Sequence, residues 1–435
     1  MSSINLRAVI FSVLVTSQIW SFASAAFAEP GDLDSSFSGD GKVTTNFTSR
    51  RDFAPGMALQ SDGKIVTAGV AGSGGSNAKF ALARHNTNGT LDSTFGGDGK
   101  VTTDLTPRLD GANSVTIDGN ERILAAGVVG VGGSDPRFAL VRYNLDGSLD
   151  TSFSGDGKVI TNLSRHYDSA RAVAIDPDGK IVIAGTVNWG PNPNFGVARY
   201  NHDGSLDTSF SGDGKLTIDV SGRSDAGLEM AIQSDGKIVV SGEGGFGRGR
   251  TDSKFALVRL TAAGALDDSF STDGKVMTQL TPRFDGAWGV SIDVNNRIVA
   301  VGFAGAWVNK RFALARYSPN GSLDTTFGGD GKVLTDFTPL HDDAGDISFQ
   351  QDEKILVGGV AGYRLNRASN SQFALARYNP NGSLDLSFSG NGKLSTNFTR
   401  KDDGVNRIAI QDDGRIVAAG YAGGGATFAI ARYLP

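Results

Sequence analysis

The chain repeats one motif seven times, and this repetition limits its fold more than any other feature. A representative copy, Phe138–Leu163, reads FALVRYNLDGSLDTSFSGDGKVITNL. The glycine of the Gly-Lys step recurs at Gly41, Gly99, Gly157, Gly214, Gly274, Gly331 and Gly392, at intervals of 57 to 61 residues. A repeat of this length indicates one supersecondary unit per copy, stacked against its neighbours.

Each copy predicts four short antiparallel strands. In the third copy, we expect the strands at Arg171–Asp176, Lys180–Gly185, Phe195–Tyr200 and Lys215–Val220, with a variable loop at Thr186–Asn194. The first strand alternates apolar and polar residues, whereas the second is a β-branched run typical of a strand covered on both faces. The intervening Pro177-Asp178-Gly179 suits a hairpin turn, because Asp-Gly readily supplies positive φ.

Seven units of four strands, with no helical periodicity after the leader, predict an all-β fold: a seven-bladed β-propeller. A β-helix would need shorter rungs, and a sandwich would not need a fixed period. The repeats begin with a fourth strand, Gly41–Phe47, and end on a third strand, Phe428–Tyr433. We therefore expect the N-terminal strand to be outermost in the last blade and to close the ring without an open edge.

Residues 1–28 have the pattern of a signal peptide. Arg7 precedes an apolar stretch, and Ala26-Phe27-Ala28 supplies small residues around a cleavage site. A membrane anchor is the alternative, but Ser, Thr and Gln interrupt the apolar run. We expect cleavage near Ala28, a single propeller domain at 29–435 with no membrane span, and a periplasmic or extracellular location.

Charge and cysteine content narrow the function further. The chain has 46 acidic and 41 basic residues, and removal of Arg7 with the leader leaves a net charge of about −6. Nucleic-acid binding, which needs a basic footprint, is therefore disfavoured. The chain has 0 cysteines, which excludes disulfides, thiol catalysis and cysteine metal sites.

Three stretches of the repeat carry a family resemblance. They are Asp-x-x-Phe-x-x-Asp-Gly-Lys-Val, Asp-Gly-Lys-Ile-Val-x-Ala-Gly and Phe-Ala-Leu-Ala-Arg-Tyr-Asn. Together they resemble the delta-60 repeat of bacterial exported proteins, and the resemblance covers Gly31 to Pro435. It implies a β-propeller in a bacterial, exported protein. The family has no settled activity, so the resemblance brings no catalytic residues.

An arginine near the end of each third strand requires a partner, because an unpaired buried charge is costly. These residues are Arg84, Arg142, Arg199, Arg259, Arg316, Arg377 and Arg432. The nearest supply of carboxylates is the Leu-Asp turn, at Asp34, Asp92, Asp150, Asp207, Asp267, Asp324 and Asp385. Seven anion sites are the functional alternative. We favour a structural ion pair in every blade, because catalysis seldom needs seven copies.

Acidic residues also gather in the turn that contains Asp146, Asp150 and Asp156. Calcium prefers such oxygen ligands, but the spacing is not that of an EF-hand and no glutamate closes it. Asp and Asn before Gly are also common turn formers. We therefore expect no metal and no other cofactor, with calcium as the alternative.

A further aspartate stands at the entry to each inner strand. The set comprises Asp52, Asp110, Asp168, Asp225, Asp285, Asp342 and Asp403, and a basic residue precedes most members by two positions. If these turns surround the channel mouth, they form a charged collar able to hold a cation or an acidic ligand. Turn capping with weak exposed ion pairs is the simpler interpretation, and we favour it.

Nucleophilic and metal catalysis lack the usual motifs. The sequence contains no Gly-x-Ser-x-Gly elbow, phosphate loop or zinc spacing. His85 and His202 are expected to be solvated, and His166 and His341 lie in equivalent loops three blades apart. We name no catalytic residue and consider an enzyme less favoured than a binding protein.

The loops between the second and third strands vary most between copies. Four of them carry aromatic and basic candidates for ligand binding: Trp189, Phe246, Arg248, Arg250, Trp307, Lys310, Tyr363, Arg364 and Arg367. Loops on a rigid scaffold often carry binding residues, and aromatic faces beside basic groups suit a sugar ring or an acidic glycan. The alternative is that these aromatics only cap the blade ends.

These features favour an exported, monomeric binding or scaffold module for a glycan or a protein partner. A polysaccharide lyase or glycoside hydrolase with its site at the channel mouth is one alternative, and a purely structural cell-surface component is another. An enzyme should show one blade that departs from its siblings with clustered Tyr, His, Lys or carboxylates. The departures visible in the sequence are aromatic and basic loops, which favours binding.

Overall fold

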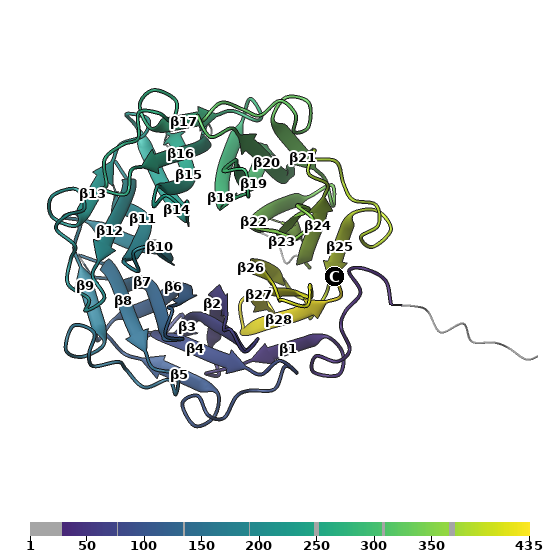
Figure 1. Ribbon diagram of the computed structural model, residues 1–435. Helices are drawn as coiled ribbons and strands as arrows, with labels where there is room; N and C mark the ends of the chain where they lie inside the picture. Colours follow the sequence, from purple (N-terminus) through teal and green to yellow (C-terminus); the bar gives the residue numbers. More distant parts are fainter. Residues whose placement is uncertain are drawn as a thin grey trace, which may run out of the picture.

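The computed structural model describes residues 28–75, 77–133, 135–190, 192–247, 252–306, 309–364 and 370–435. These residues form 28 strands in seven four-stranded antiparallel sheets, and no helix occurs among them. The sheets are arranged around a common axis as the blades of a propeller (Figure 1). The predicted seven-bladed, all-β fold is therefore confirmed.

The first three blades are β2 (Arg51–Leu59), β3 (Ile65–Ser73), β4 (Lys79–His85), β5 (Lys100–Thr103); β6 (Leu109–Ile117), β7 (Ile123–Val131), β8 (Arg137–Tyr143), β9 (Lys158–Thr161); and β10 (Tyr167–Ile175), β11 (Ile181–Trp189), β12 (Asn194–Tyr200), β13 (Lys215–Ile218). The next three are β14 (Ser224–Ile232), β15 (Ile238–Phe246), β16 (Lys254–Leu260), β17 (Lys275–Thr278); β18 (Phe284–Ile292), β19 (Ile298–Ala306), β20 (Asn309–Tyr317), β21 (Lys332–Thr335); and β22 (His341–Phe349), β23 (Ile355–Tyr363), β24 (Gln372–Tyr378), β25 (Lys393–Thr396). The last blade joins β26 (Gly404–Ile410), β27 (Ile416–Ala422) and β28 (Thr427–Tyr433) to β1 (Lys42–Thr45).

The N-terminal strand closes the ring as predicted. β1 pairs with β28 in register from Lys42 opposite Ala431 to Thr45 opposite Phe428. A further bridge joins Leu33 to Tyr433. Figure 1 shows β1 at the outside of the last blade and β26 next to the axis. The last sheet is thus built from both ends of the chain.

The two inner strands are longer than predicted, because a β-bulge interrupts each innermost strand. In the third blade the register shifts between Ala170 and Ala172, and pairing then continues to Tyr167 opposite Trp189. The expected loop at Thr186–Asn194 is therefore a strand as far as Trp189. The bulge also brings the Ser169 carbonyl toward Gly185, where an added Cβ would lie 2.1 Å from that oxygen. This contact explains why every second strand contains a glycine at this position.

Neighbouring blades share apolar cores and one buried polar contact. The Tyr143 hydroxyl donates to Thr103 Oγ1 of the preceding blade at 2.8 Å, and four other interfaces repeat this Tyr–Thr bond. In the first blade His85 replaces the tyrosine, with Nε2 at 2.9 Å from Thr45 Oγ1. The expectation of a solvated His85 is wrong, because the end of the third strand is buried. Burial lowers the pKa of His85 to about 4.

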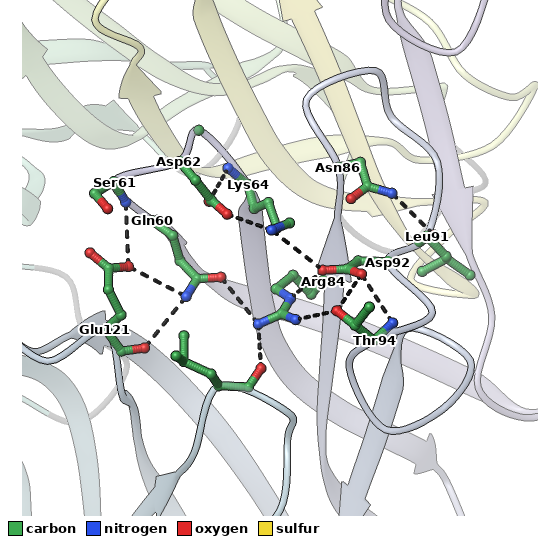
Figure 2. Close-up of polar contacts among 12 residues, drawn as sticks. Gln60, Ser61, Asp62, Lys64, Arg84, Asn86, Leu91, Asp92, Thr94 and Glu121 are labelled. Carbon is green, nitrogen blue, oxygen red and sulfur yellow. Dashed lines mark hydrogen bonds and ion pairs between the residues drawn. The ribbon is translucent and has the colours of Figure 1, made fainter.

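The structure describes a bond from the third-strand arginine to a backbone carbonyl of the next blade in six of the seven blades. Figure 2 shows this arrangement for Arg84. Arg84 Nε lies 2.8 Å from Asp92 Oδ2, and Nη2 donates to Thr94 Oγ1 at 3.0 Å. Its Nη1 reaches the Leu145 carbonyl of the second blade, and its guanidinium lies over the Phe95 ring. The structure pairs all seven arginines with the aspartates named from the sequence, at 2.8–2.9 Å.

The aspartates proposed as a charged collar are not presented to solvent. Asp52 has no exposed surface, and its two oxygens accept from the Phe47, Thr48 and Gly72 backbone amides and the Thr48 hydroxyl. The same bonds recur at the other members, Asp110, Asp168, Asp225, Asp285, Asp342 and Asp403. These carboxylates cap the turns, so they are unsuited to hold a ligand.

Candidate functional site

The bulge of each innermost strand points one residue toward the propeller axis. One such residue per blade lines a single cavity of about 460 Å³: Pro55, Asn113, Arg171, Leu228, Trp288, Gly345 and Asn406. No two of these blades present the same chemistry except for the two asparagines. The seven blades therefore share one backbone arrangement, while the side chains at the bulge position differ and give the cavity a lining of mixed polarity.

A second cavity of about 630 Å³ adjoins the first and shares Phe53, Trp288, Gly345 and Asn406 with it. We call the two together the axial groove. The ends of the second strands also line it, at Ser73, Trp189 and Tyr363. The axial groove thus opens on the face of the propeller that carries the variable loops.

Five aromatic side chains line the walls of the axial groove. They are Phe53, Trp189, Trp288, Tyr363 and Tyr421. Trp189 and Trp288 are 43% and 38% exposed, which is high for indole rings. Trp288 lines both cavities and donates from Nε1 to Glu243 Oε1 at 3.3 Å. Its ring also packs edge-on against Phe303 at 5.4 Å, so the exposed indole is held in one orientation.

An ion pair crosses the axis between residues that directly follow the bulge residues in the sequence. Arg407 Nη2 on β26 contacts Glu229 Oε2 on β14, and these strands lie on opposite sides of the ring (Figure 1). Asp346 on β22 faces the same arginine and accepts from the Ile408 amide at 2.8 Å. Burial raises the pKa of Glu229 to about 7, although the Arg407 charge opposes the shift. Because Arg407 lines the first cavity, the pair forms its floor.

A buried lysine lies beside the second cavity. Lys310 Nζ lies 3.8 Å from Asp343 Oδ1, 3.7 Å from the Phe303 ring centroid and 4.8 Å from that of Phe284. Burial raises the pKa of Asp343, and the Lys310 charge opposes this shift. Burial and the Lys310 charge both lower the pKa of the nearby His341. This corner of the groove therefore has an unusual concentration of desolvated charge.

The structure divides the binding candidates named from the sequence. Trp189 and Tyr363 line the axial groove. Phe246 and Lys310 are buried, so they cannot form an accessible ligand surface. Arg364 is exposed but lines neither cavity. The remaining candidates, Arg248, Arg250, Trp307 and Arg367, lie outside the described residues.

Most of the charged side chains of the axial groove were missed from the sequence. Glu229, Asp346 and Arg407 occupy a position that is Gly, Ser or Ala in the other blades, and Glu243 occupies one that is otherwise apolar or Thr. Lys310, already named from its loop, also stands where the other copies have a small residue or proline. Comparison of the seven copies position by position would have found them. The blades therefore also differ in acidic residues, beyond the aromatic and basic loops expected from the sequence.

The acidic turns use their oxygens locally. Asp146 Oδ1 accepts from the amide and hydroxyl of Ser148, Asp150 pairs with Arg142, and Asp156 accepts from the Lys158 amide. Across the described parts of the chain, no group of three or more His, Cys, Asp or Glu residues is arranged to hold a metal. In the same residues, no helix is long and apolar enough to span a membrane.

Solved structures with a similar fold include proteins of very different kinds. A catalytically inactive virginiamycin B lyase from Staphylococcus aureus with quinupristin has a TM-score of 0.53 at 11% identity, covering 91% of this chain and 99% of its own. A fungal AA5-family alcohol oxidase in complex with copper has a TM-score of 0.50 at 13% identity, and the match covers 93% of this chain and 76% of the oxidase. A PL25 ulvan lyase bound to a GlcA–Rha3S saccharide has a TM-score of 0.50 at 12% identity, and the match covers 90% of this chain and 96% of the lyase. Such low identities show a shared fold alone.

No curated protein matches the sequence. A model of a repeat β-propeller family, in contrast, matches seven segments: residues 60–95, 120–153, 177–210, 233–270, 295–327, 350–388 and 411–435. These segments recur once per blade and together span more than half of the chain. The chain therefore belongs to the family described as "Domain of unknown function (DUF5122) beta-propeller".

Proposed function

We propose that this protein is an exported binding module that holds an oligosaccharide in its axial groove. The observation that carries the proposal is the pair of exposed indoles, Trp189 and Trp288, in a concave site at the propeller axis. A sugar ring presents apolar C–H faces to an aromatic ring and hydroxyls to neighbouring polar groups. Asn113, Asn406 and Arg171 supply such polar groups beside the indoles.

The shape of the axial groove favours a ligand of several sugar units. Its two cavities join through Phe53 and Trp288, so one ligand can contact both. Trp189 lies in the first cavity, and Tyr363 and Tyr421 lie in the second. Aromatic surfaces spread over two adjoining cavities suit successive rings of a chain better than one small molecule.

The test is calorimetric titration of the mature protein with a panel of neutral, acidic and amino-sugar hexasaccharides. Trp288→Ala should abolish binding of any hexasaccharide that the native protein holds. Leu386→Ala removes another exposed apolar side chain, 67% exposed and outside the axial groove, and should leave affinity unchanged. Equal affinity of native protein and Trp288→Ala for the hexasaccharide would contradict the proposal.

A glycoside hydrolase or polysaccharide lyase is the second candidate, and one observation favours it. Asp343 has a raised pKa in the second cavity, and Glu243 lines the first cavity beside Trp288. A pair of carboxyl groups at a saccharide site can support acid–base cleavage of glycosidic bonds. New reducing ends, or the ultraviolet absorbance of an unsaturated uronate, released by native protein but not by Asp343→Asn, would establish this activity. If the protein binds a saccharide but never cleaves it, the binding function stands and the enzyme is excluded for that saccharide.

Export, the monomeric state and the delta-60 relationship also belong to the proposal. The leader supports export, but residues 1–27 lie outside the described part of the chain. Expression of the full chain in a bacterium should yield a periplasmic or released protein whose N-terminal residue is Glu29. An uncleaved chain in the cytoplasm would contradict export.

A further inference from the structure

The second cavity of the axial groove combines aromatic walls with carboxylates. Phe53, Trp288, Tyr363 and Tyr421 provide the rings, and Asp343 and Asp402 provide the carboxylates. Phe53 and Tyr421 lie against each other at 5.4 Å between ring centroids. Aromatic faces carry partial negative charge, so rings and carboxylates together attract a cation more strongly than either does alone.

One carboxylate at this cavity, that of Asp343, is poorly solvated. The Asp343 side chain is 16% exposed, and its Oδ1 accepts no hydrogen bond. Burial raises the pKa of the Tyr421 phenol, and the charges of Asp402, Asp343 and Asp403 raise it further. A phenol resists ionisation in this way where the local potential is negative. Asp343 and Asp402 therefore place carboxylates beside the aromatic rings of the second cavity.

The same corner already holds one ammonium group by these means. Lys310 Nζ lies over the Phe303 and Phe284 rings and beside Asp343. This lysine lies beside Asp343, and the carboxylates of Asp402 and Glu243 also lie in this corner. Arg51 also lines the second cavity, but it is exposed at the start of β2. The second cavity therefore offers a ligand's ammonium group the same kinds of contact, aromatic rings and carboxylates, that surround Lys310.

We propose that the second cavity binds the ammonium group of an amino sugar, held among Phe53, Trp288, Tyr363 and Tyr421 and facing Asp343 and Asp402. This inference rests on the proposed saccharide function, because the first cavity would hold the adjoining sugar units. A bare metal ion is a poorer occupant, because calcium needs about six to eight oxygen ligands and no group of three or more His, Cys, Asp or Glu residues in the described parts of the chain is arranged to hold a metal.

The experiment compares three hexasaccharides by calorimetry at mildly acidic pH: one of glucosamine, one of N-acetylglucosamine and one of glucose. The glucosamine hexamer carries ammonium groups, whereas the other two are neutral. It should bind about tenfold more tightly than either, which corresponds to about 1.4 kcal/mol. Its affinity should also fall as salt is added.

Two variants separate charge from packing. Asp402→Asn keeps the oxygen that accepts from the Ser371 amide at 3.1 Å and removes only the charge. It should erase most of the preference for the glucosamine hexamer without lowering affinity for the other two. Tyr421→Leu should reduce binding of the glucosamine hexamer with little change in melting temperature, and Leu386→Ala should change neither quantity.

Tetramethylammonium distinguishes the two proposals, since it carries the charge without a sugar. Binding of this ion that is lost in Asp402→Asn supports the cation site even if no hexasaccharide binds, and in that case only the saccharide function fails. If the three hexasaccharides bind equally and Asp402→Asn changes nothing, the ammonium site is overturned while the saccharide function remains. Failure of both the ion and the glucosamine hexamer to bind also overturns the ammonium site.

Discussion

Replacement of Arg259 by methionine tests whether the repeated ion pair stabilises the propeller. Arg259 Nε lies 2.8 Å from Asp267 Oδ2, and the two side chains are 4% and 6% exposed. The arginine also donates to Ser269 Oγ at 3.0 Å and to the Pro319 carbonyl of the next blade. Burial alone would raise the pKa of Asp267, but the Ser269 hydrogen bonds and the Arg259 charge hold it below the ordinary value.

Methionine fills similar space but leaves Asp267 charged, buried and without its cation. Breaking a buried pair from one side costs about 3–5 kcal/mol, and that is the loss expected for Arg259→Met. The double variant Arg259→Met/Asp267→Asn removes the stranded charge and keeps an acceptor for Ser269. It should be more stable than the single variant by about 2 kcal/mol.

Urea unfolding followed by circular dichroism measures these differences, provided that the slopes agree between variants. The matched control is Arg223→Met in the same blade, which breaks an exposed ion pair. Arg223 Nη1 lies 2.7 Å from Asp252 Oδ2, and the two side chains are 53% and 48% exposed. This control should cost at most about 1 kcal/mol. Equal losses for Arg259→Met and Arg223→Met, or no recovery in the double variant, would show that the buried pair does not stabilise the propeller.

Three other predictions concern the frame of the propeller. Deletion of Gly31–Phe47 removes β1 and exposes the edge of β28, so the truncated protein should aggregate or melt far lower; an unchanged, monomeric protein would show that β1 does not close the ring. Gly185→Ala places a Cβ 2.1 Å from the Ser169 carbonyl and should cost about 1–3 kcal/mol or more in urea unfolding, whereas Gly190→Ala, with open space around it, should cost little. The third is pH dependence: the pKa of Glu229 is raised from 4.5 to about 7, so the folded state holds this proton more tightly than the unfolded state. The stabilisation is present below pH 4.5 and is lost as the pH rises toward 7; native protein should therefore lose on the order of 3 kcal/mol relative to Glu229→Gln across this window. Parallel stability curves for these two proteins would contradict the burial of Glu229.

The fold was predictable because the repeat itself carries the information. The glycine period, the Asp-Gly turns and the phase of the terminal strands lead to seven closed blades without any long-range assumption. The pairing of Arg84 with Asp92 was accessible for the same reason, since the two residues lie eight positions apart in six of the seven copies. In the last blade, ring closure brings Asp34 to Arg432. What recurs in the sequence could be derived from the sequence.

The axial groove was not predictable in the same way, because it depends on what differs between blades. The Arg407–Glu229 contact joins strands on opposite sides of the ring, and only the closed propeller brings them together. The bulge that turns Arg171 and Trp288 toward the axis is a one-residue register shift, which strand periodicity does not show. Asp52 was considered for a charged collar because its sequence position reveals the turn but not the four hydrogen bonds that occupy its carboxylate.

A crystal structure of the mature protein with a bound hexasaccharide would show whether the saccharide occupies the axial groove. The sugar to use is the one that binds most tightly in calorimetry. We predict that its rings lie on Trp288 and Trp189 at the propeller axis, with the next units beside Phe53 and Tyr421. A saccharide bound on the opposite face or along the outer strands, with the axial groove unoccupied, would contradict the account.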